Sequence, residues 1–193
     1  MADFDAGHTI TFADDLAVYE QGDLASYDLI VQCWSMGSLT PSQEAALVAA
    51  VRAGTGFAGW HGGVIGTCVG NAAYLRMVGG RFLWHPDGPR RYRVSIVPQQ
   101  AAHPIVAGLS DFEVDTEQYW LLSDAANTTL ATCTFQPEPT MPWDRPTDMP
   151  VAWTRQWGEG RVFVCTLGHD TADLAVPPVR TMIHRGLAWA ARP

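Results

Sequence analysis

His61 stands in a glycine-rich stretch, Gly59-Trp60-His61-Gly62-Gly63, directly after a short apolar run. Glycines two positions before and two positions after a central residue are typical of the sharp strand-to-helix turn that presents the nucleophile in G-x-S-x-G enzymes. The pattern predicts that the His61 side chain projects from the apex of such a turn. A histidine there can act as an acid, a base or a metal ligand. The alternative is a glycine-rich turn in which the histidine has no role.

A second candidate, His169, ends the apolar run of residues 161–168 and is followed by Asp170. A histidine at the carboxyl end of a strand, beside a carboxylate, can be a base that the carboxylate orients, or a metal ligand. We therefore expect His61 and His169 to face one another as the acid and the base of a catalytic site. The alternative is a surface histidine.

Glu117 is the third candidate catalytic residue, as a second acid or base or as the acceptor for a substrate hydroxyl. Aromatic residues stand close to it and to the other candidates along the chain. Flat, rigid, half-polar rings suit the face of a sugar and readily line pockets. The alternatives are a solvent-facing glutamate and rings that fill the core. The residues expected to bind substrate are Trp34, Trp60, His85, Tyr119 and Trp120.

Histidines and a carboxylate also suggest a metal site. His61, His85 and His169, with Glu117 nearby, are candidate ligands for a divalent ion such as zinc. The sequence has no H-x-x-x-H or similar short spacing, so these ligands would have to converge from separate loops. No pattern indicates a nucleotide cofactor.

The elements that must position these residues are predicted from periodicity. Residues 27–34 and 55–60 are apolar runs typical of buried parallel strands. Thr40, Pro41 and Gln43 mark the start of a helix between them. The result is a βαβ unit, and ligands of such sheets bind at the carboxyl ends of the strands. This edge carries Trp34, His61 and His169.

Later segments predict a different kind of strand. Residues 90–98, 111–120 and 128–135 alternate between apolar and polar residues, as half-exposed strands do. Residues 136–150 are rich in proline and predict a loop, and residues 150–168 predict a hairpin that turns at 158–160. Helices are expected at 64–78 and 173–191. We predict an α/β fold with a mainly parallel central sheet and an antiparallel extension.

Composition narrows the class of protein. Apolar residues make up 47% of the 193 residues, which favours one well-packed domain over residues 1–193. The net charge of −8 argues against a nucleic-acid partner. No apolar stretch approaches the roughly 20 residues of a membrane-spanning helix, and the N-terminus lacks the pattern of a secretory leader. The four cysteines are not spaced as a disulfide framework, so we expect a cytoplasmic protein with reduced thiols.

Four stretches together resemble the ThuA-like (trehalose utilisation) family, in that family's order: residues 27–63, 79–86, 103–120 and 149–170. The resemblance implies the class I glutamine amidotransferase-like superfamily and a flavodoxin-like three-layer sandwich. In true amidotransferases the turn carries a nucleophilic cysteine, served by a histidine from a later strand. Here the turn carries His61, and the later histidine is His169. The resemblance therefore implies that the chain is not a functional glutamine amidotransferase.

The same resemblance implies that His85 and Glu117 stand at positions that recur in the family. Members usually open with a strand and a helix before the equivalent of residues 7–20, and this chain starts almost at that point. We expect the usual first strand and helix to be lacking. The sheet then lacks a member, another element fills the gap, or the chain is a shortened version.

Two functional hypotheses follow. The first is a carbohydrate-related enzyme for a sugar or keto-sugar, a hydrolase or an isomerase or lyase, with a site centred on His61 and His169. The alternative is a non-catalytic sugar-binding or regulatory module of the same fold. The expected partner is a sugar-like small molecule, with no nucleic acid and no membrane. Exposed strand edges favour a homo-oligomer such as a dimer.

Overall fold

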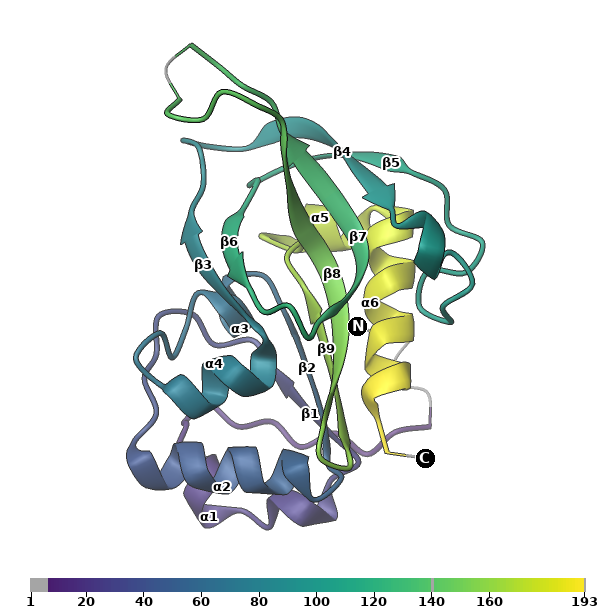
Figure 1. Cartoon of the computed structure of the whole chain (residues 1–193). Coiled ribbons are helices and arrows are strands. Elements are labelled where there is room, and N and C mark those ends of the chain that lie inside the picture. Colours follow the sequence, from purple (N-terminus) through teal and green to yellow (C-terminus); the bar gives the residue numbers. More distant parts are fainter. Residues whose placement is uncertain (1–6, 140, 193) are drawn as a thin grey trace.

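The computed structural model describes residues 7–139 and 141–192 (Figure 1). Its main element is a seven-stranded sheet, and a small second sheet pairs β3 (Gly80–Trp84) with β6 (Trp120–Ser123). The strands of the large sheet are, in spatial order, β1 (Leu29–Gln32), β2 (Gly56–Trp60), β9 (Gly160–Cys165), β8 (Thr147–Trp157), β7 (Thr128–Phe135), β4 (Arg90–Ile96) and β5 (Phe112–Thr116).

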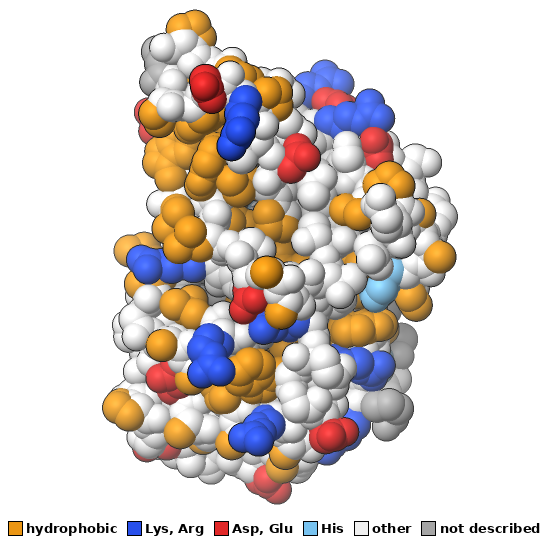
Figure 2. Space-filling model, in the orientation of Figure 1, with side chains coloured by type: hydrophobic (Ala, Val, Ile, Leu, Met, Phe, Trp, Pro, Cys, Tyr) orange, Lys and Arg blue, Asp and Glu red, His pale blue; other side chains and the backbone are white. Residues whose placement is uncertain are grey.

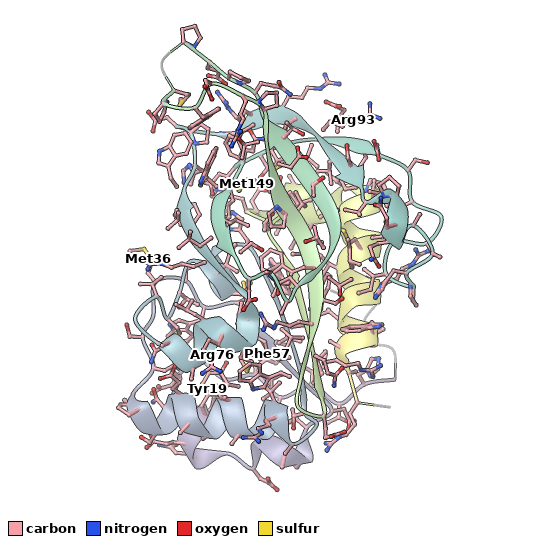
Figure 3. The ribbon with its side chains drawn as sticks, viewed as in Figure 1. Tyr19, Met36, Phe57, Arg76, Arg93 and Met149 are labelled. Carbon is pink, nitrogen blue, oxygen red and sulfur yellow. The ribbon has the colours of Figure 1, made fainter. Side chains whose placement is uncertain are left out.

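Helices cover both faces of strands β1, β2 and β9 (Figure 1). On one side lie α1 (Val18–Gln21), α2 (Pro41–Arg52) and α4 (Ala72–Val78), and on the other lies α6 (Pro177–Ala190). The shorter turns are α3 (Gly62–Ile65), α5 (Thr171–Ala175), η1 (Leu24–Ser26) and η2 (Pro98–Gln100). The buried apolar residues form a contiguous core, in which Phe57 is fully buried near the helices α2 and α4 (Figure 3). Among the described residues, no helix is both long and apolar enough to cross a bilayer.

The predicted βαβ unit is confirmed as β1–α2–β2, with β1 and β2 parallel. Its helix starts with the expected capping box. The Thr40 hydroxyl accepts a hydrogen bond from the Gln43 amide at 3.2 Å, and the Gln43 side chain accepts one from the Thr40 amide at 3.0 Å. These two bonds satisfy amides that have no partner within the helix. The hairpin of β8 and β9 is confirmed too, with Trp157 paired to Gly160 across its turn.

The expectation of a mainly parallel sheet is wrong in its proportions. Only the β1–β2 and β2–β9 pairings are parallel, whereas the other four pairings of the large sheet are antiparallel. Parallel pairing needs a crossover connection, usually a helix. Between β4 and β9 the described residues form no α-helix, and the chain returns through turns and loops. The antiparallel strands, which we expected as an extension of a parallel sheet, are therefore the larger part of the large sheet.

Two predicted helices are each split. The helix expected at 64–78 is instead α3 and α4, separated by a turn that holds Gly66, Gly70 and a left-handed Cys68 (φ 52°). The helix expected at 173–191 is α5 followed by α6, because Pro177 and Pro178 cannot continue the hydrogen-bond ladder of a preceding turn.

The predicted loop at 136–150 is shorter than expected, because β8 begins at Thr147 and includes Pro150. Proline is tolerated in a strand at a bulge. Pro150 pairs with Thr132, where the register between β7 and β8 shifts. The described residues before Leu29 contain no strand, and β1 is an edge of the sheet.

Gly186 provides a test of the packing between α6 and the sheet. A methyl group at Gly186 would overlap the ring of Phe163, which is 1% exposed and has no room to move aside. We expect Gly186→Ala to lower the free energy of unfolding by about 1–3 kcal/mol in urea denaturation, from overpacking. Gly70→Ala is the control, since a methyl group at Gly70 meets nothing within 4 Å. Equal stability of the two variants would contradict this packing.

Candidate active site

The backbone turn at His61 is the one that the glycine pattern predicts. β2 ends at Trp60, α3 starts at Gly62, and His61 between them has a φ of 53°. A methyl group at Gly59 would lie 2.5 Å from the Gln32 carbonyl oxygen, and one at Gly63 would lie 2.7 Å from Cys33 Cα. Both positions therefore require glycine. The His61 amide donates to the Cys165 carbonyl at 2.8 Å, which fixes the turn to β9.

The structure brings the three candidate histidines together around Glu117. Nε2 of His61 lies 3.1 Å from Oε2 of Glu117, and Nδ1 of His169 lies 3.4 Å from the same oxygen. Nε2 of His85 lies 3.6 Å from the other oxygen, Oε1. The rings of His61 and His169 meet edge to face, with centroids 5.1 Å apart. Three separate segments thus converge on the carboxylate of a fourth.

Tyr119 completes this group. Its hydroxyl lies 3.2 Å from Nδ1 of His61, and its ring stacks against that of His85 with centroids 5.9 Å apart. Phe82 of β3, which the sequence patterns did not single out, packs on Tyr119 with centroids 4.4 Å apart. The cluster is closed at His61 and Glu117, whose side chains are 14% and 15% exposed, and opens to solvent at His169, which is 47% exposed.

Burial dominates the electrostatics of His61. Loss of solvation lowers the pKa of His61 from 6.5 to about 4, helped by nearby His169 and opposed by Glu117. Close approach to a carboxylate would raise this pKa, but desolvation is the larger effect, so we take His61 as neutral at pH 7. Neutral His61 can donate from Nε2 to Glu117 and accept at Nδ1 from the Tyr119 hydroxyl. Burial and Glu117 raise the pKa of Tyr119, so this hydroxyl keeps its proton.

Asp173 is a functional residue that the sequence patterns missed. Asp170, which follows His169 in the chain, was expected to orient it but instead caps α5 by accepting from the Asp173 amide at 2.9 Å. The carboxylate of Asp173 accepts from the backbone amide of His169 at 2.9 Å and from the hydroxyl of Thr116. Asp173 therefore ties the segment that carries His169 to the one that carries Glu117. The sequence signal that could have identified Asp173 is its spacing, three residues after Asp170, which caps α5.

The predicted tryptophans pack in different places, although Trp60 and Trp120 are next to residues of the cluster along the chain. Trp34 lines a groove along β1, and Trp60 packs against Gly168. Trp120 stacks on Trp143 with centroids 4.6 Å apart, in an aromatic group that includes Trp84 and Phe135. Trp84 in this group is 39% exposed. Figure 2 shows hydrophobic side chains gathered on the upper left part of the face in view.

The candidate metal ligands are brought together only in part. Donor atoms of His61, Glu117 and His169 all lie within 4.8 Å of one another, a spacing that one zinc ion can bridge with small adjustments. His85, the third predicted histidine ligand, is not in this group and approaches the opposite carboxylate oxygen.

A family model described as ThuA, trehalose utilisation, matches residues 4–190. The chain belongs to the ThuA family. No curated protein matches its sequence significantly. A ThuA-like protein from Bacteroides uniformis is 16% identical with a TM-score of 0.79, over 98% of this chain and 79% of that one. A cytoplasmic protein from Salmonella typhimurium LT2 is 14% identical with a TM-score of 0.70, over 99% and 87%.

A more distant likeness extends to part of a larger enzyme. A β-galactosidase from Rahnella sp. R3 is 15% identical with a TM-score of 0.55, over 90% of this chain but only 25% of that one. At these low identities, the likeness to the solved structures shows a shared fold and nothing further. That fold is an α/β fold with a mixed sheet. The similar structures do not bear on the site itself. The arrangement described above, of His61, His85, His169 and Glu117, is that of this chain alone.

The low pKa of His61 has a consequence for stability. Between about pH 4 and 6.5 the unfolded chain binds a proton at His61 that the folded chain does not. Neutral His61 therefore contributes fully to the free energy of unfolding above pH 6.5. This contribution, up to about 3 kcal/mol, is lost as the pH falls towards 4. We expect urea unfolding of the metal-free protein to show a larger loss between pH 7.5 and 4.5 than that of His61→Asn.

The more exposed His85 provides the control. His85→Asn should lose stability with falling pH as the wild type does. If His61→Asn also follows the wild type, His61 is not held neutral by burial.

Proposed function

We propose that this ThuA-family chain is an enzyme that acts on a carbohydrate or sugar derivative by general acid–base catalysis. The single observation that carries the proposal is the convergence of three imidazoles on the carboxylate of Glu117, with the Tyr119 hydroxyl bonded to one of them, His61. The family description, trehalose utilisation, supports a sugar as substrate. Both a hydrolase and an isomerase or lyase need such proton transfers.

His169 is the best placed base. Its Nδ1 faces Glu117 at 3.4 Å, so an Nδ1 proton donated to the carboxylate leaves the lone pair on Nε2. This side chain is about half exposed, so Nε2 is accessible to a sugar hydroxyl or a water molecule. Glu117 would then stabilise the imidazolium that forms, as the aspartate does in catalytic triads.

His85 is the best placed acid. Its Nδ1 lies 2.7 Å from the Pro86 carbonyl, which accepts the Nδ1 proton. Nε2 lies 3.6 Å from an oxygen of Glu117, and a protonated His85 would carry its second proton on this nitrogen. That proton is available to a developing alkoxide. His61 and Tyr119, whose polar atoms bond within the cluster, would position Glu117 rather than touch the substrate.

A metal-dependent variant is the second candidate, favoured by the close grouping of His61, Glu117 and His169. These three residues would hold a zinc ion, which when bound would supply an activated water at neutral pH. The two candidates differ in what His169 does, because a ligand nitrogen is not free to accept a proton.

Turnover of sugars tests the proposal. With trehalose, other disaccharides and keto-sugars screened by NMR, we expect Glu117→Gln to lower kcat/KM by about 10²- to 10⁴-fold. The reason is that the side-chain amide of glutamine cannot accept hydrogen bonds from all three imidazoles. Glu113→Gln on β5, whose side chain is 48% exposed, is the matched control and should retain full activity. If the wild type binds a sugar without turning it over, the non-catalytic sugar-binding module is supported. If the wild type shows no binding and no turnover, a carbohydrate role is contradicted.

Zinc titration separates the two mechanisms. If the ion is held by His61, Glu117 and His169, calorimetry should show zinc binding that His169→Asn weakens by at least about tenfold. His85→Asn should bind zinc as the wild type does, because His85 lies outside this group. Equal weakening by both variants would place the ion elsewhere, and full sugar turnover in the presence of a chelator would exclude the metal-dependent variant.

A further inference from the structure

The single helical turn α3, which follows His61, needs contacts outside itself to stay in place. It spans only Gly62–Ile65, and one helical turn has little stability alone. His61 ahead of it has a φ of 53°, a conformation that a residue other than glycine keeps only where its surroundings hold it. One such contact is the bond from the His61 amide to the Cys165 carbonyl. The position of the imidazole therefore also depends on what holds α3.

Two carbonyl groups of α3 accept hydrogen bonds from neighbouring elements. The last carbonyls of a helix lack a partner within that helix. Here the Gly63 carbonyl accepts from the side-chain amide of Gln32 at 3.1 Å and from the Trp34 amide at 3.0 Å. The Val64 carbonyl accepts from the Tyr74 hydroxyl at 2.8 Å. Donors at the end of β1 and on α4 thus hold α3 in place.

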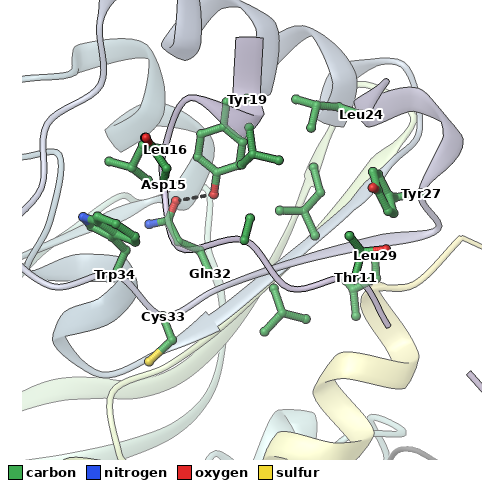
Figure 4. Close-up of a pocket in the computed structure, with 14 residues that line it drawn as sticks. Thr11, Asp15, Leu16, Tyr19, Leu24, Tyr27, Leu29, Gln32, Cys33 and Trp34 are labelled. Carbon is green, nitrogen blue, oxygen red and sulfur yellow. Dashed lines mark hydrogen bonds between the residues drawn. The ribbon is translucent and has the colours of Figure 1, made fainter. Parts of the chain in front are cut away.

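Gln32 is the centre of this set of bonds. It is the last residue of β1 and is 3% exposed. Its Oε1 accepts from the Tyr19 hydroxyl at 2.8 Å (Figure 4). Its Nε2 donates to the Gly63 carbonyl and, at 2.7 Å, to the Tyr74 hydroxyl. The opposite orientation of the amide would set Oε1 against the Gly63 carbonyl, which is also an acceptor, so the orientation is fixed.

The start of α3 lies against a partner of the His61 ring. A methyl group at Gly62 would meet the Tyr119 hydroxyl at 3.4 Å. This hydroxyl lies 3.2 Å from Nδ1 of His61, and Nε2 of the same ring lies 3.1 Å from Glu117. Because Gly62 directly follows His61, a displacement of α3 would change both of these bonds.

We propose that Gln32 is a positioning residue of the site, which through α3 holds the His61 imidazole in place between its two partners. Gln32 acts through the backbone of the turn and touches no ring of the cluster. Tyr74 supports the same turn: burial raises the pKa of its hydroxyl well above the ordinary value, so the hydroxyl keeps the proton that it donates. The effect of Gln32 on turnover rests on the proposed function, whereas its effect on the His61 ring does not.

Nitrogen-15 spectra of the histidine rings test this in the metal-free protein at pH 7.5. In the wild type we expect His61 as a single tautomer, with its proton on the Nε2 that donates to Glu117. Gln32→Met keeps the length of the side chain but loses the donor to Gly63, and should shift or average the two ring-nitrogen signals of His61. Tyr19→Phe is the matched control. It removes the bond at the other end of Gln32 and leaves both donations intact, so these signals should not change.

Turnover is a second measurement, provided that the chain is the sugar enzyme proposed above. Gln32→Met should lower kcat by at least about tenfold, since a misplacement of about 1 Å can cost about 10²-fold in rate. KM should stay within about threefold, because Gln32 touches no ligand. Tyr19→Phe should keep kcat within about threefold of the wild type. A wild type without turnover would contradict the proposed function and leave the role of Gln32 to the ring spectra.

The wild type also supplies a measurement that needs no variant. The side-chain amide protons of Gln32 should exchange with solvent at least about tenfold more slowly than those of the exposed Gln99. Equal exchange would overturn the proposal. If Gln32→Met does not fold, Tyr74→Phe, which removes the other side-chain donor to α3, takes its place. Ring signals of His61 that this substitution leaves as in the wild type, or that Tyr19→Phe changes as much, would overturn the proposal too.

Discussion

A single buried carboxylate constrains the whole site. Glu117 is 15% exposed, and a carboxylate at that depth costs free energy unless hydrogen-bond donors surround it. Here imidazoles approach both of its oxygens, and each comes from a different segment of the chain. Moving any one of these segments would remove an imidazole that offsets the cost of burying the carboxylate. The loops at the end of the sheet are therefore coupled through one side chain.

The two halves of the sheet contribute different parts of this site. The parallel strands β2 and β9 lead into His61 and His169 at their carboxyl ends. Glu117 and Tyr119 lie in the three-residue link between β5 of the large sheet and β6 of the small one. The link is held by the Tyr92 hydroxyl, which donates to the Glu117 carbonyl at 3.0 Å. The antiparallel half thus contributes directly to the site, because it brings the Glu117 carboxylate to the imidazoles that follow the parallel strands.

Local sequence patterns predicted the parts of this architecture that depend on neighbouring residues. The capping box at Thr40 and the turn at His61 involve residues only a few positions apart, and both are found as expected. The proportions of the sheet were missed, because alternation marks a strand without telling which neighbour it pairs with. Asp170 and Asp173 were confused for a similar reason: adjacency along the chain is a poor guide to which carboxylate contacts a backbone amide. The tryptophans were placed by chemical suitability alone, and packing decided their positions.

Replacing a cysteine by a histidine at the turn changes the chemistry that the fold can support. Burial raises the pKa of Cys165 to about 12 and that of Cys133 to about 11, so neither buried thiol supplies a thiolate near neutral pH. Burial raises the pKa of Cys33 as well, and this thiol lies at the end of β1 rather than at the turn. A thiolate at the apex would attack a carbonyl carbon and form a covalent bond. A neutral imidazole bonded to both Glu117 and Tyr119 has no free lone pair for such an attack. The kind of backbone turn that presents a nucleophile in G-x-S-x-G enzymes here buries a hydrogen-bonding imidazole, whereas the side chain of His169 is 47% exposed.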